Sequence, residues 1–408
     1  MSCPCPPSPS CLDLLNGIAL LIDDQINDET SSAYKLKTQI EDENIPVIAK
    51  KEIPGEIDSF VKNLLGISFV ILDWKFSPNP DLQIPPEVRI PENVEISATI
   101  DFLKRLLDAT YCPVFIISQE NVEEIKRHLD KEKITINGFH PRVFVSGKDD
   151  LLDGKLFASL NDWVANRPIT YTLKTWEKQF RNSKQHLFDS FEKKSPIWPL
   201  ILWKSFKDDN VNPSWSLSNA ISNILSNHMS SFIRFEESFL ETDCSDINKN
   251  GIRSVFEEQR CMQLTGSEDI GTGDLFRVLD ENGNVSYLIN IRAQCDLLHD
   301  SNQDLVQLYC LKGTIIQDVK KFKELYSKKN EQFIEKVNHA IVPFIDNCLV
   351  EFNFTDLLVI PFGQIRRIRF ARLLPPYITR LQQRYALYLS RTGIPRTPYD
   401  LFFTDTTN

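Results

Sequence analysis

Residues 19–25 read ALLIDDQ, so four apolar residues run directly into two adjacent carboxylates, Asp23 and Asp24. A short apolar run that ends in polar residues is typical of a buried strand. Runs of the same kind recur along the chain, at residues 45–49, 67–72, 113–118 and 142–146. Amphipathic stretches between them predict helices. Strands that are apolar on both faces and alternate with helices predict a doubly wound, five-stranded parallel sheet of the receiver or flavodoxin type.

The rest of the chain shows two further patterns. Residues 156–264 are mostly helical in pattern, whereas short apolar runs return from residue 265, with a hairpin-type Asn282-Gly283 between two of them. We expect more strands at 306–311 and 349–362 and helices at 317–345 and 373–392. The predicted organisation is a disordered tail (1–11), a receiver-like domain (12–155), a helical connector (156–264) and an α+β output or docking domain (265–408).

Composition limits the classes of function. The 408 residues are 42% hydrophobic and 25% charged, and the net charge of −10 argues against bulk attraction to nucleic acid. No apolar run reaches the roughly 18 residues of a membrane span, and the first residues lack the basic and apolar regions of a secretory signal. Nine irregularly spaced cysteines argue against a disulfide framework. We therefore expect a cytoplasmic protein with reduced thiols and no membrane contact.

Polar residues follow the predicted strands where each strand ends. Asp23 and Asp24 follow the first strand, Asp73 the third, Ser118 closes the fourth, and Lys148 comes shortly after the fifth. The carboxyl ends of parallel strands meet at one edge of a sheet, and ligands bind in the crevice there. We expect these five side chains to converge on one pocket.

The residue types in that pocket favour a metal site with phosphoryl chemistry. Carboxylates packed together repel one another, and a hard divalent cation such as Mg²⁺, which prefers oxygen ligands, relieves the repulsion. Asp73 would then be a nucleophile toward a phosphoryl group, while Lys148 offsets charge on the transferring oxygens and Ser118 donates a hydrogen bond. The alternatives are structural: an aspartate that caps a helix, or a lysine that is simply solvated.

The motifs LLIDDQ, VILDW, FIISQ and VFVSGK occur in the order of a known family, over residues 18 to about 150. In this respect the chain resembles the receiver domain of two-component response regulators. The resemblance implies a phosphoprotein that binds Mg²⁺. The roles it implies are acidic metal residues for Asp23 and Asp24, the phospho-acceptor for Asp73, a metal ligand for the backbone carbonyl of Lys75, the switch hydroxyl for Ser118 and the active-site lysine for Lys148.

The chain departs from the family's pattern at three places. Asp149 follows the lysine where the family usually has proline, and Val145 occupies the usual aromatic position, with Phe144 adjacent. A proline-rich insert at 77–95 replaces the loop after the acceptor. A receiver fold used only as a protein-docking scaffold is therefore an open alternative.

A second resemblance rests on the domain plan and on the phrases INIRAQCDL and FARLLPPYITRLQQRYALYLSRTGIP. The chain looks like divergent response-receiver proteins encoded beside ATPases of the histidine-kinase/chaperone (GHKL) type in bacterial conflict and anti-phage loci. This resemblance implies a kinase-like or GHKL-type ATPase partner and a role in antiviral defence. A homodimer is compatible with it.

The C-terminal end is rich in arginine. From Glu351 onward there are eight arginines and no lysine, against four acids. Arg380, Arg384 and Arg391 share one face of a predicted helix and are candidates for anion or partner binding, because guanidinium groups bind phosphate and carboxylate bidentately. The alternative is ion pairing within the chain.

Three functions follow from these patterns. The first is a cytoplasmic two-component signalling regulator, not an enzyme beyond self-phosphorylation from a donor and autodephosphorylation. The second is the unphosphorylated scaffold, and the third is a nucleic-acid-binding effector acting through its arginine-rich end.

Overall fold

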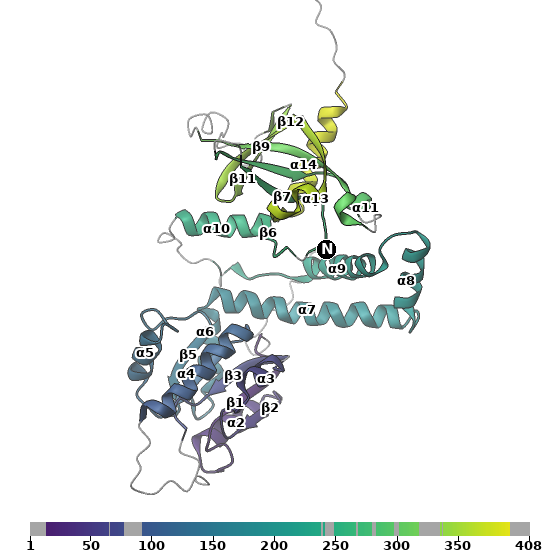
Figure 1. The fold of residues 1–408 in the computed structure, drawn as a ribbon. Coiled ribbons are helices and arrows are strands. Elements are labelled where there is room, and N and C mark those ends of the chain that lie inside the picture. The colour runs from purple at the N-terminus through teal and green to yellow at the C-terminus, as the bar shows by residue number, and fades with distance from the viewer. Residues whose placement is uncertain are drawn as a thin grey trace, which may run out of the picture. The chain divides into compact units, whose positions relative to one another are not determined.

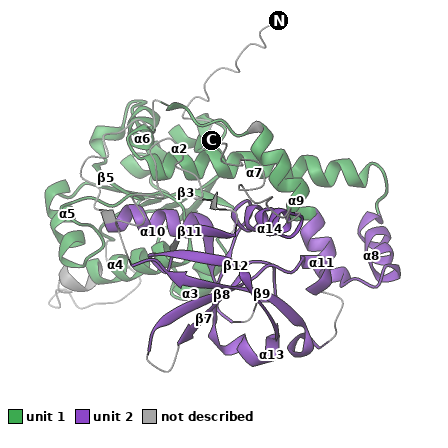
Figure 2. Cartoon of the chain, turned by 90° about the horizontal axis from the view of Figure 1, so that it is seen from above, with its two compact units in different colours: residues 1–196, 221–242 green, residues 197–220, 243–408 purple. Residues whose placement is uncertain are grey.

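The computed structural model describes residues 14–64, 66–76, 92–237, 240, 249–266, 268–279, 283–297, 302–317, 335–336 and 338–391 (Figure 1). The predicted tail (1–11) and most of the proline-rich insert lie outside these residues. The chain forms two compact units, 1–196 with 221–242 and 197–220 with 243–408 (Figure 2). The domain boundaries predicted at residues 155 and 264 stay predictions.

The first unit contains a five-stranded, all-parallel sheet, as the sequence predicted. Its strands are β1 (Ile18–Ile22), β2 (Val47–Lys50), β3 (Ile67–Leu72), β4 (Val114–Ser118) and β5 (Val143–Gly147). Their order in the sheet is β2-β1-β3-β4-β5. This is the flavodoxin-like order, in which the direction of strand addition reverses at β1 and a crevice opens at the carboxyl ends of β1 and β3.

Helices cover both faces of this sheet, because successive residues of each strand point to opposite sides. Leu21, Phe69 and Phe115 belong to one buried cluster, with α2 (Ser32–Asp42) and α6 (Leu156–Ala165). The alternate residues, such as Leu20, Val70 and Ile116, belong to the other cluster, which includes side chains of α3 (Ile57–Lys62), α4 (Glu92–Ala109) and α5 (Val122–Lys131).

Capping side chains set where two of these helices begin. The Ser31 hydroxyl accepts a hydrogen bond from the backbone N–H of Tyr34 and starts α2. Asn121 accepts from the N–H groups of Glu123 and Glu124 and starts α5. These caps satisfy N–H groups that have no partner within the helix.

Longer helices follow the sheet. They are α7 (Pro168–Glu192), α8 (Trp198–Asp208), α9 (Pro213–Phe232) and α10 (Lys249–Arg260). The first turns of α7 and α8 contain proline, which suits that position because the first N–H groups of a helix have no partner within it. Among the described helices, none has both the length and the apolar character that crossing a bilayer requires.

The second unit contains a curled antiparallel sheet of eight strands in the order β10-β11-β12-β9-β8-β7-β13-β6. Its strands are β6 (Cys261–Gln263), β7 (Asp274–Leu279), β8 (Val285–Asn290), β9 (Gln307–Ile315), β10 (Glu335–Lys336), β11 (His339–Ile345), β12 (Cys348–Pro361) and β13 (Arg369–Leu373). Helix α14 (Tyr377–Leu389) packs on this sheet through Ile378 and Leu381. Short turns of helix occur at Asp149–Leu151, Gln294–Leu297, Gln303–Leu305, Phe362–Ile365 and Arg366–Ile368.

The hairpin predicted around Asn282-Gly283 is confirmed, since β7 and β8 pair antiparallel on either side of it. The helix predicted over 317–345 is wrong in its described part, where β10 and β11 form instead. In β11, Ala340 and Val342 are buried while the strand pairs along its length with β12. The two strands expected in 349–362 are one long strand, with a register shift between Phe352 and Leu357.

Candidate metal centre

Backbone pairing holds the acids at the carboxyl edge of the parallel sheet. The Asp23 N–H donates to the Lys50 carbonyl, and the Asp73 N–H donates to the Ile22 carbonyl, both at 2.9 Å. The ladder thus extends one residue past β1 and β3, to the first acid of each loop. Asp23 and Asp73 are consequently adjacent although fifty residues separate them in the sequence.

The Lys148 ammonium lies between these two carboxylates. Its Nζ is 2.7 Å from Oδ2 of Asp23 and 2.7 Å from Oδ2 of Asp73, and all three side chains are buried. The Lys148 N–H donates to the Ser118 carbonyl at 2.8 Å, so pairing between β4 and β5 positions the lysine. The sequence predicted that Lys148 would join this pocket but not that it would bridge both acids.

Asp24 completes a cluster of three carboxylates. One oxygen from each of Asp23, Asp24 and Asp73 lies within 4.8 Å of the others. Asp24 is half-buried, whereas the other two acids are almost wholly enclosed. The cluster is therefore closed on its sheet side and open at Asp24.

The donor set fits a hard divalent cation. Three carboxylates and one ammonium leave an excess of two negative charges, which is the charge that one such ion neutralises. All of the cluster's ligands are oxygens, which both Mg²⁺ and Ca²⁺ prefer. Asp23, Asp24 and Asp73 would hold the ion, and the ion would supply positive charge against a developing oxyanion. The Lys75 carbonyl, two residues after Asp73, stays a predicted ligand.

Burial and like charge act together on Asp73. Burial and, after it, the charge of Asp23 raise the pKa of Asp73 to about 6, against the lowering effects of Lys148 and of Ser118. Burial alone would lower the pKa of Lys148, but Asp73 and Asp23 raise it above its ordinary value. The lysine is therefore held cationic between the two acids.

Ser118 lies next to the Asp73 carboxylate. Its side chain is buried and lowers the pKa of Asp73. A long hydrogen bond, 3.4 Å, comes to its oxygen from the Glu120 N–H. The structure thus places all five polar residues of the predicted pocket at one sheet edge.

The loop after Asp73 contributes two contacts that the sequence did not indicate. Trp74 is buried, and its ring lies 6.2 Å from that of His128 on α5. The Lys75 ammonium pairs with Glu120 at 3.6 Å, across the loops that follow β3 and β4. Such contacts join residues far apart in the chain, so spacing and periodicity do not signal them.

The aromatic residue of β5 does not face the α4 and α5 side of the sheet. Phe144 packs instead with Phe115 and Trp163, with ring centroids 6.0 Å and 5.9 Å away. Val145, three residues before the lysine, packs into the cluster that contains side chains of α4 and α5. The departure noted in the sequence is thus a difference in which face of the sheet carries the aromatic ring.

Of the predicted arginine face, Arg380 and Arg384 lie on α14 in the second unit, whereas α14 ends at Leu389, so Arg391 lies beyond the helix and does not share its face. Arg380 and Arg384 are half-buried, and Arg391 is exposed with its guanidinium 4.1 Å from the Tyr388 ring centroid. Other arginines of the same region form ion pairs within the unit. Arg369 and Arg372 both bind the buried Asp274, at 3.0 Å and 2.6 Å.

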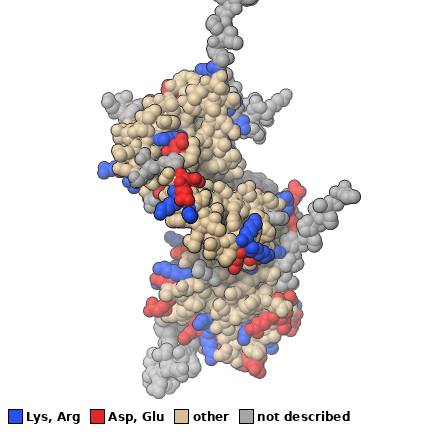
Figure 3. Space-filling view, turned by 90° about the vertical axis from the view of Figure 1, so that its right-hand side faces the viewer, with Lys and Arg blue, Asp and Glu red and all other residues tan. Residues whose placement is uncertain are grey.

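These ion pairs favour the intramolecular alternative for much of the arginine-rich segment. On the face drawn in Figure 3, basic and acidic side chains are interspersed, and the described residues there form no continuous basic surface. Arg380, Arg384 and Arg391 stay predicted contacts for an anion or a partner.

Comparison with known proteins gives no relative from which to transfer a function. No protein-family model matches the chain. A search of curated proteins likewise finds no match. The fold and the geometry of the acid cluster therefore carry the functional argument.

Proposed function

We propose that this protein is a signalling regulator whose parallel-sheet unit binds Mg²⁺ and accepts a phosphoryl group on Asp73. One observation supports this above the others: the buried Lys148 ammonium bridges Asp23 and Asp73 while a third acid, Asp24, stands beside them at the open side. A purely structural ion pair needs one acid for one base. Here two further negative charges are left for a cation to balance.

The side chains suit nucleophilic attack on phosphorus. An oxygen of Asp73 would bond to the phosphorus of a donor while the bond to the donor's leaving group breaks, which gives an acyl phosphate. Lys148, already 2.7 Å from Asp73, would stay beside the new phosphoryl oxygens and offset their charge. The Ser118 hydroxyl would donate to one of them. Apart from this transfer and its hydrolytic reversal, we propose no enzymatic activity.

The phosphoryl donor in this proposal is a kinase-like or GHKL-type ATPase, and the setting is bacterial anti-phage defence. Both rest on the sequence resemblance. A phosphorylated kinase and a small acyl phosphate supply the same group, so the chemistry of the site can be tested without the partner.

The test is phosphorylation of the full-length protein by acetyl phosphate with Mg²⁺. Intact-mass spectrometry should detect one acid-stable, base-labile phosphoryl group per chain, and beryllofluoride with Mg²⁺ should raise the melting temperature. Asp73→Asn should abolish both effects. Asp149→Asn, which changes an exposed acid next to Lys148, should leave them intact.

The docking-scaffold alternative is favoured by one observation, the absence of an aromatic ring from position 145. It predicts that wild type and Asp73→Asn respond alike to every phosphoryl donor and to beryllofluoride. Identical behaviour of the two proteins would therefore replace the proposed function with the scaffold.

A further inference from the structure

Two histidines meet where α7 and α9 lie side by side in the first unit. The ring centroids of His186 on α7 and His228 on α9 are 4.6 Å apart, and the ring planes are inclined by 41°. Both residues belong to the first unit, which combines residues 1–196 with 221–242. Neither belongs to the acid cluster, so they form a separate group of side chains that can bind a metal.

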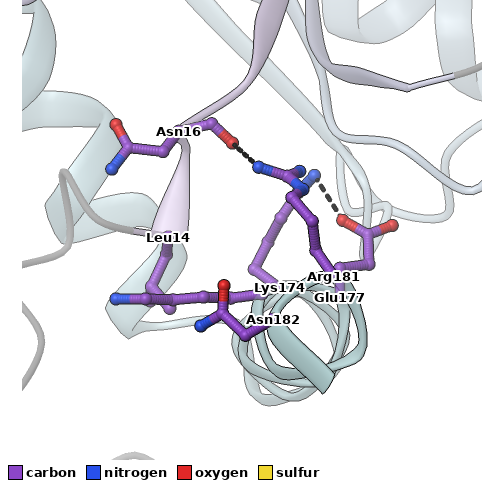
Figure 4. A pocket seen from close by; sticks show the side chains of 7 residues that line it. Leu14, Asn16, Lys174, Glu177, Arg181 and Asn182 are labelled. Carbon is purple, nitrogen blue, oxygen red and sulfur yellow. Dashed lines mark hydrogen bonds and ion pairs between the residues drawn. The ribbon is translucent and has the colours of Figure 1, made fainter. Parts of the chain in front are cut away.

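Hydrogen bonds anchor the first half of α7 to the parallel sheet (Figure 4). The Lys174 ammonium is buried and donates to the Ser68 carbonyl of β3. Two turns further along, the Arg181 guanidinium donates to the Asn16 carbonyl at 3.5 Å. The sheet therefore holds the backbone of α7 up to five residues before His186.

Further contacts hold the end of α9 beside α7. Leu187 and Met229, the residues that follow the two histidines, are both buried. Beyond the end of α9, the Glu236 N–H donates to the Tyr171 hydroxyl of α7 at 2.8 Å. The two imidazoles are thus carried by backbones that are fixed relative to each other.

Imidazole nitrogens are the ligands that Zn²⁺, Cu²⁺ and Ni²⁺ accept most readily after thiolates, whereas carboxylates suit Mg²⁺. Zn²⁺ bonds to a ring nitrogen at about 2.0–2.1 Å, so two nitrogens of a tetrahedral site lie about 3.3 Å apart. A centroid separation of 4.6 Å is compatible with that spacing, because the χ2 torsion of histidine is broad and lets the rings turn. His186 is exposed and His228 half-buried, so an ion can reach both from solvent.

We propose that His186 and His228 together bind one divalent transition-metal ion such as Zn²⁺, across α7 and α9. Within the described residues, no third histidine, cysteine or carboxylate forms a compact group with this pair, so water completes the coordination. An ion with two protein ligands exchanges more readily than one in a closed site of four. The pair therefore responds to the free metal concentration, and it does not depend on the function proposed for the acid cluster.

The test is equilibrium dialysis of the full-length, metal-free protein against Zn²⁺, with excess Mg²⁺ to compete at the acid cluster. Wild type should bind one Zn²⁺ per chain that His186→Gln and His228→Gln each bind at least about tenfold more weakly, since even the loss of a ligand's own hydrogen-bond partner has that effect. His140→Gln, at a half-buried histidine of the same unit outside the pair, should bind Zn²⁺ as wild type does.

His186→Cys separates the loss of a ligand from a change in the fold. A thiolate also binds Zn²⁺, so His186→Cys should retain the ion that His186→Gln loses. Zn²⁺ should likewise raise the melting temperature of wild type, His140→Gln and His186→Cys more than that of either partner of the pair changed to glutamine.

Two results would overturn the proposal. Equal Zn²⁺ binding by wild type and both glutamine variants would show that the rings only pack against each other and that any bound ion is adventitious. A loss in His186→Gln that His186→Cys does not rescue would assign the effect to the structure of α7. All of these variants keep Asp73, so their phosphorylation by acetyl phosphate distinguishes failure here from failure at the acid cluster.

Discussion

The Asp73 carboxylate is the acceptor of several converging donors. It takes hydrogen bonds from the Trp74 N–H at 2.8 Å and from Lys148 at 2.7 Å, and the nearby Ser118 also lowers its pKa. Even so, burial and the neighbouring Asp23 hold its pKa at about 6. The Asp73 carboxylate thus accepts hydrogen bonds but is costly to ionise, so the free energy of unfolding of the protein should depend on pH.

Asp73→Asn should stabilise the metal-free protein at neutral pH. The folded pKa of about 6 lies above the ordinary value of 3.8, so the folded state retains a proton that the unfolded state has lost between those values. The Asp73 carboxyl therefore does not lower the free energy of unfolding below about pH 4, where it is protonated in both states. As the pH rises through 6, the free energy of unfolding falls, because the buried carboxyl must then ionise. The asparagine should recover on the order of 2 kcal/mol at pH 7.

Urea unfolding of wild type and Asp73→Asn at pH 4 and pH 7, with chelator present, measures this difference. The difference in the free energy of unfolding between the two proteins should be small at pH 4 and larger at pH 7. A difference that is constant with pH would show that the carboxyl does not titrate in this range.

Lys148→Ala should have the opposite effect. Removing the ammonium leaves Asp23 and Asp73 buried without their shared counter-charge, which costs about 3 kcal/mol in comparable cases. Mg²⁺ should restore part of this loss, because it supplies the missing positive charge. Lys51→Ala, at an exposed lysine, is the control.

Denaturant midpoints of both lysine variants with and without Mg²⁺ provide the measurement. A larger loss in Lys148→Ala that shrinks with Mg²⁺ is the expected pattern. An equal loss in the two variants would show that Lys148 is no more than a surface cation.

At the scale of elements, the parallel sheet could be predicted because its strands carry a local signal. Runs such as 69–72 are apolar without interruption, and the polar residues that follow such runs had to meet once the strands were parallel. Convergence of Asp23, Asp73 and Lys148 followed from topology alone. The distances between them did not, because they depend on register between strands that are distant in the chain.

The second unit was harder to predict. Residues 339–345 were expected to be helical, yet they form β11, where partners in β12 decide the structure. β12 follows β11 directly after Asp346 and Asn347, but the apolar spacing of one short segment does not distinguish a strand from a helix. The strands expected at 349–362 form the single strand β12, and the contacts of the buried Asp274 with two arginines were missed because they join residues 95 and 98 positions apart.

Gly17→Ala tests the junction between β1 and α7. The substitution combines a left-handed φ with a contact of 2.8 Å to Ser68, so it should lower the free energy of unfolding by about 1–3 kcal/mol. Gly55→Ala is the matched control, since its added Cβ meets nothing within 4 Å and its φ is ordinary. Chemical denaturation of both variants provides the comparison, and equal midpoints would contradict the close approach at Gly17.

At the scale of the whole molecule, the two compact units should respond differently to metal. The acid cluster lies entirely within the first unit, between loops that follow β1 and β3. Mg²⁺ should therefore slow amide hydrogen exchange in peptides covering residues 23–26 and 73–76. Peptides from the eight-stranded sheet should exchange at the same rate with and without the ion.

Hydrogen–deuterium exchange mass spectrometry on the full chain distinguishes protection confined to the acid cluster from protection spread over the whole chain. Protection spread evenly over both units would point to non-specific ion binding to an acidic protein. Asp149→Asn should retain the local protection, because Asp149 is not one of the three acids of the cluster. Asp24→Asn should reduce the protection, because Asp24 is one of them.

The indole of Trp74 gives the acid cluster a built-in optical reporter. It follows Asp73 directly, is buried, and its ring centroid lies 6.2 Å from that of His128 on α5. Any ion or covalent group that alters the loop also alters the electric field and quenching around this one ring. The fluorescence of the Trp74→Phe protein, subtracted from that of the native chain, leaves the emission of Trp74. Changes in that emission would report events at the Asp73 carboxylate in real time, without a label.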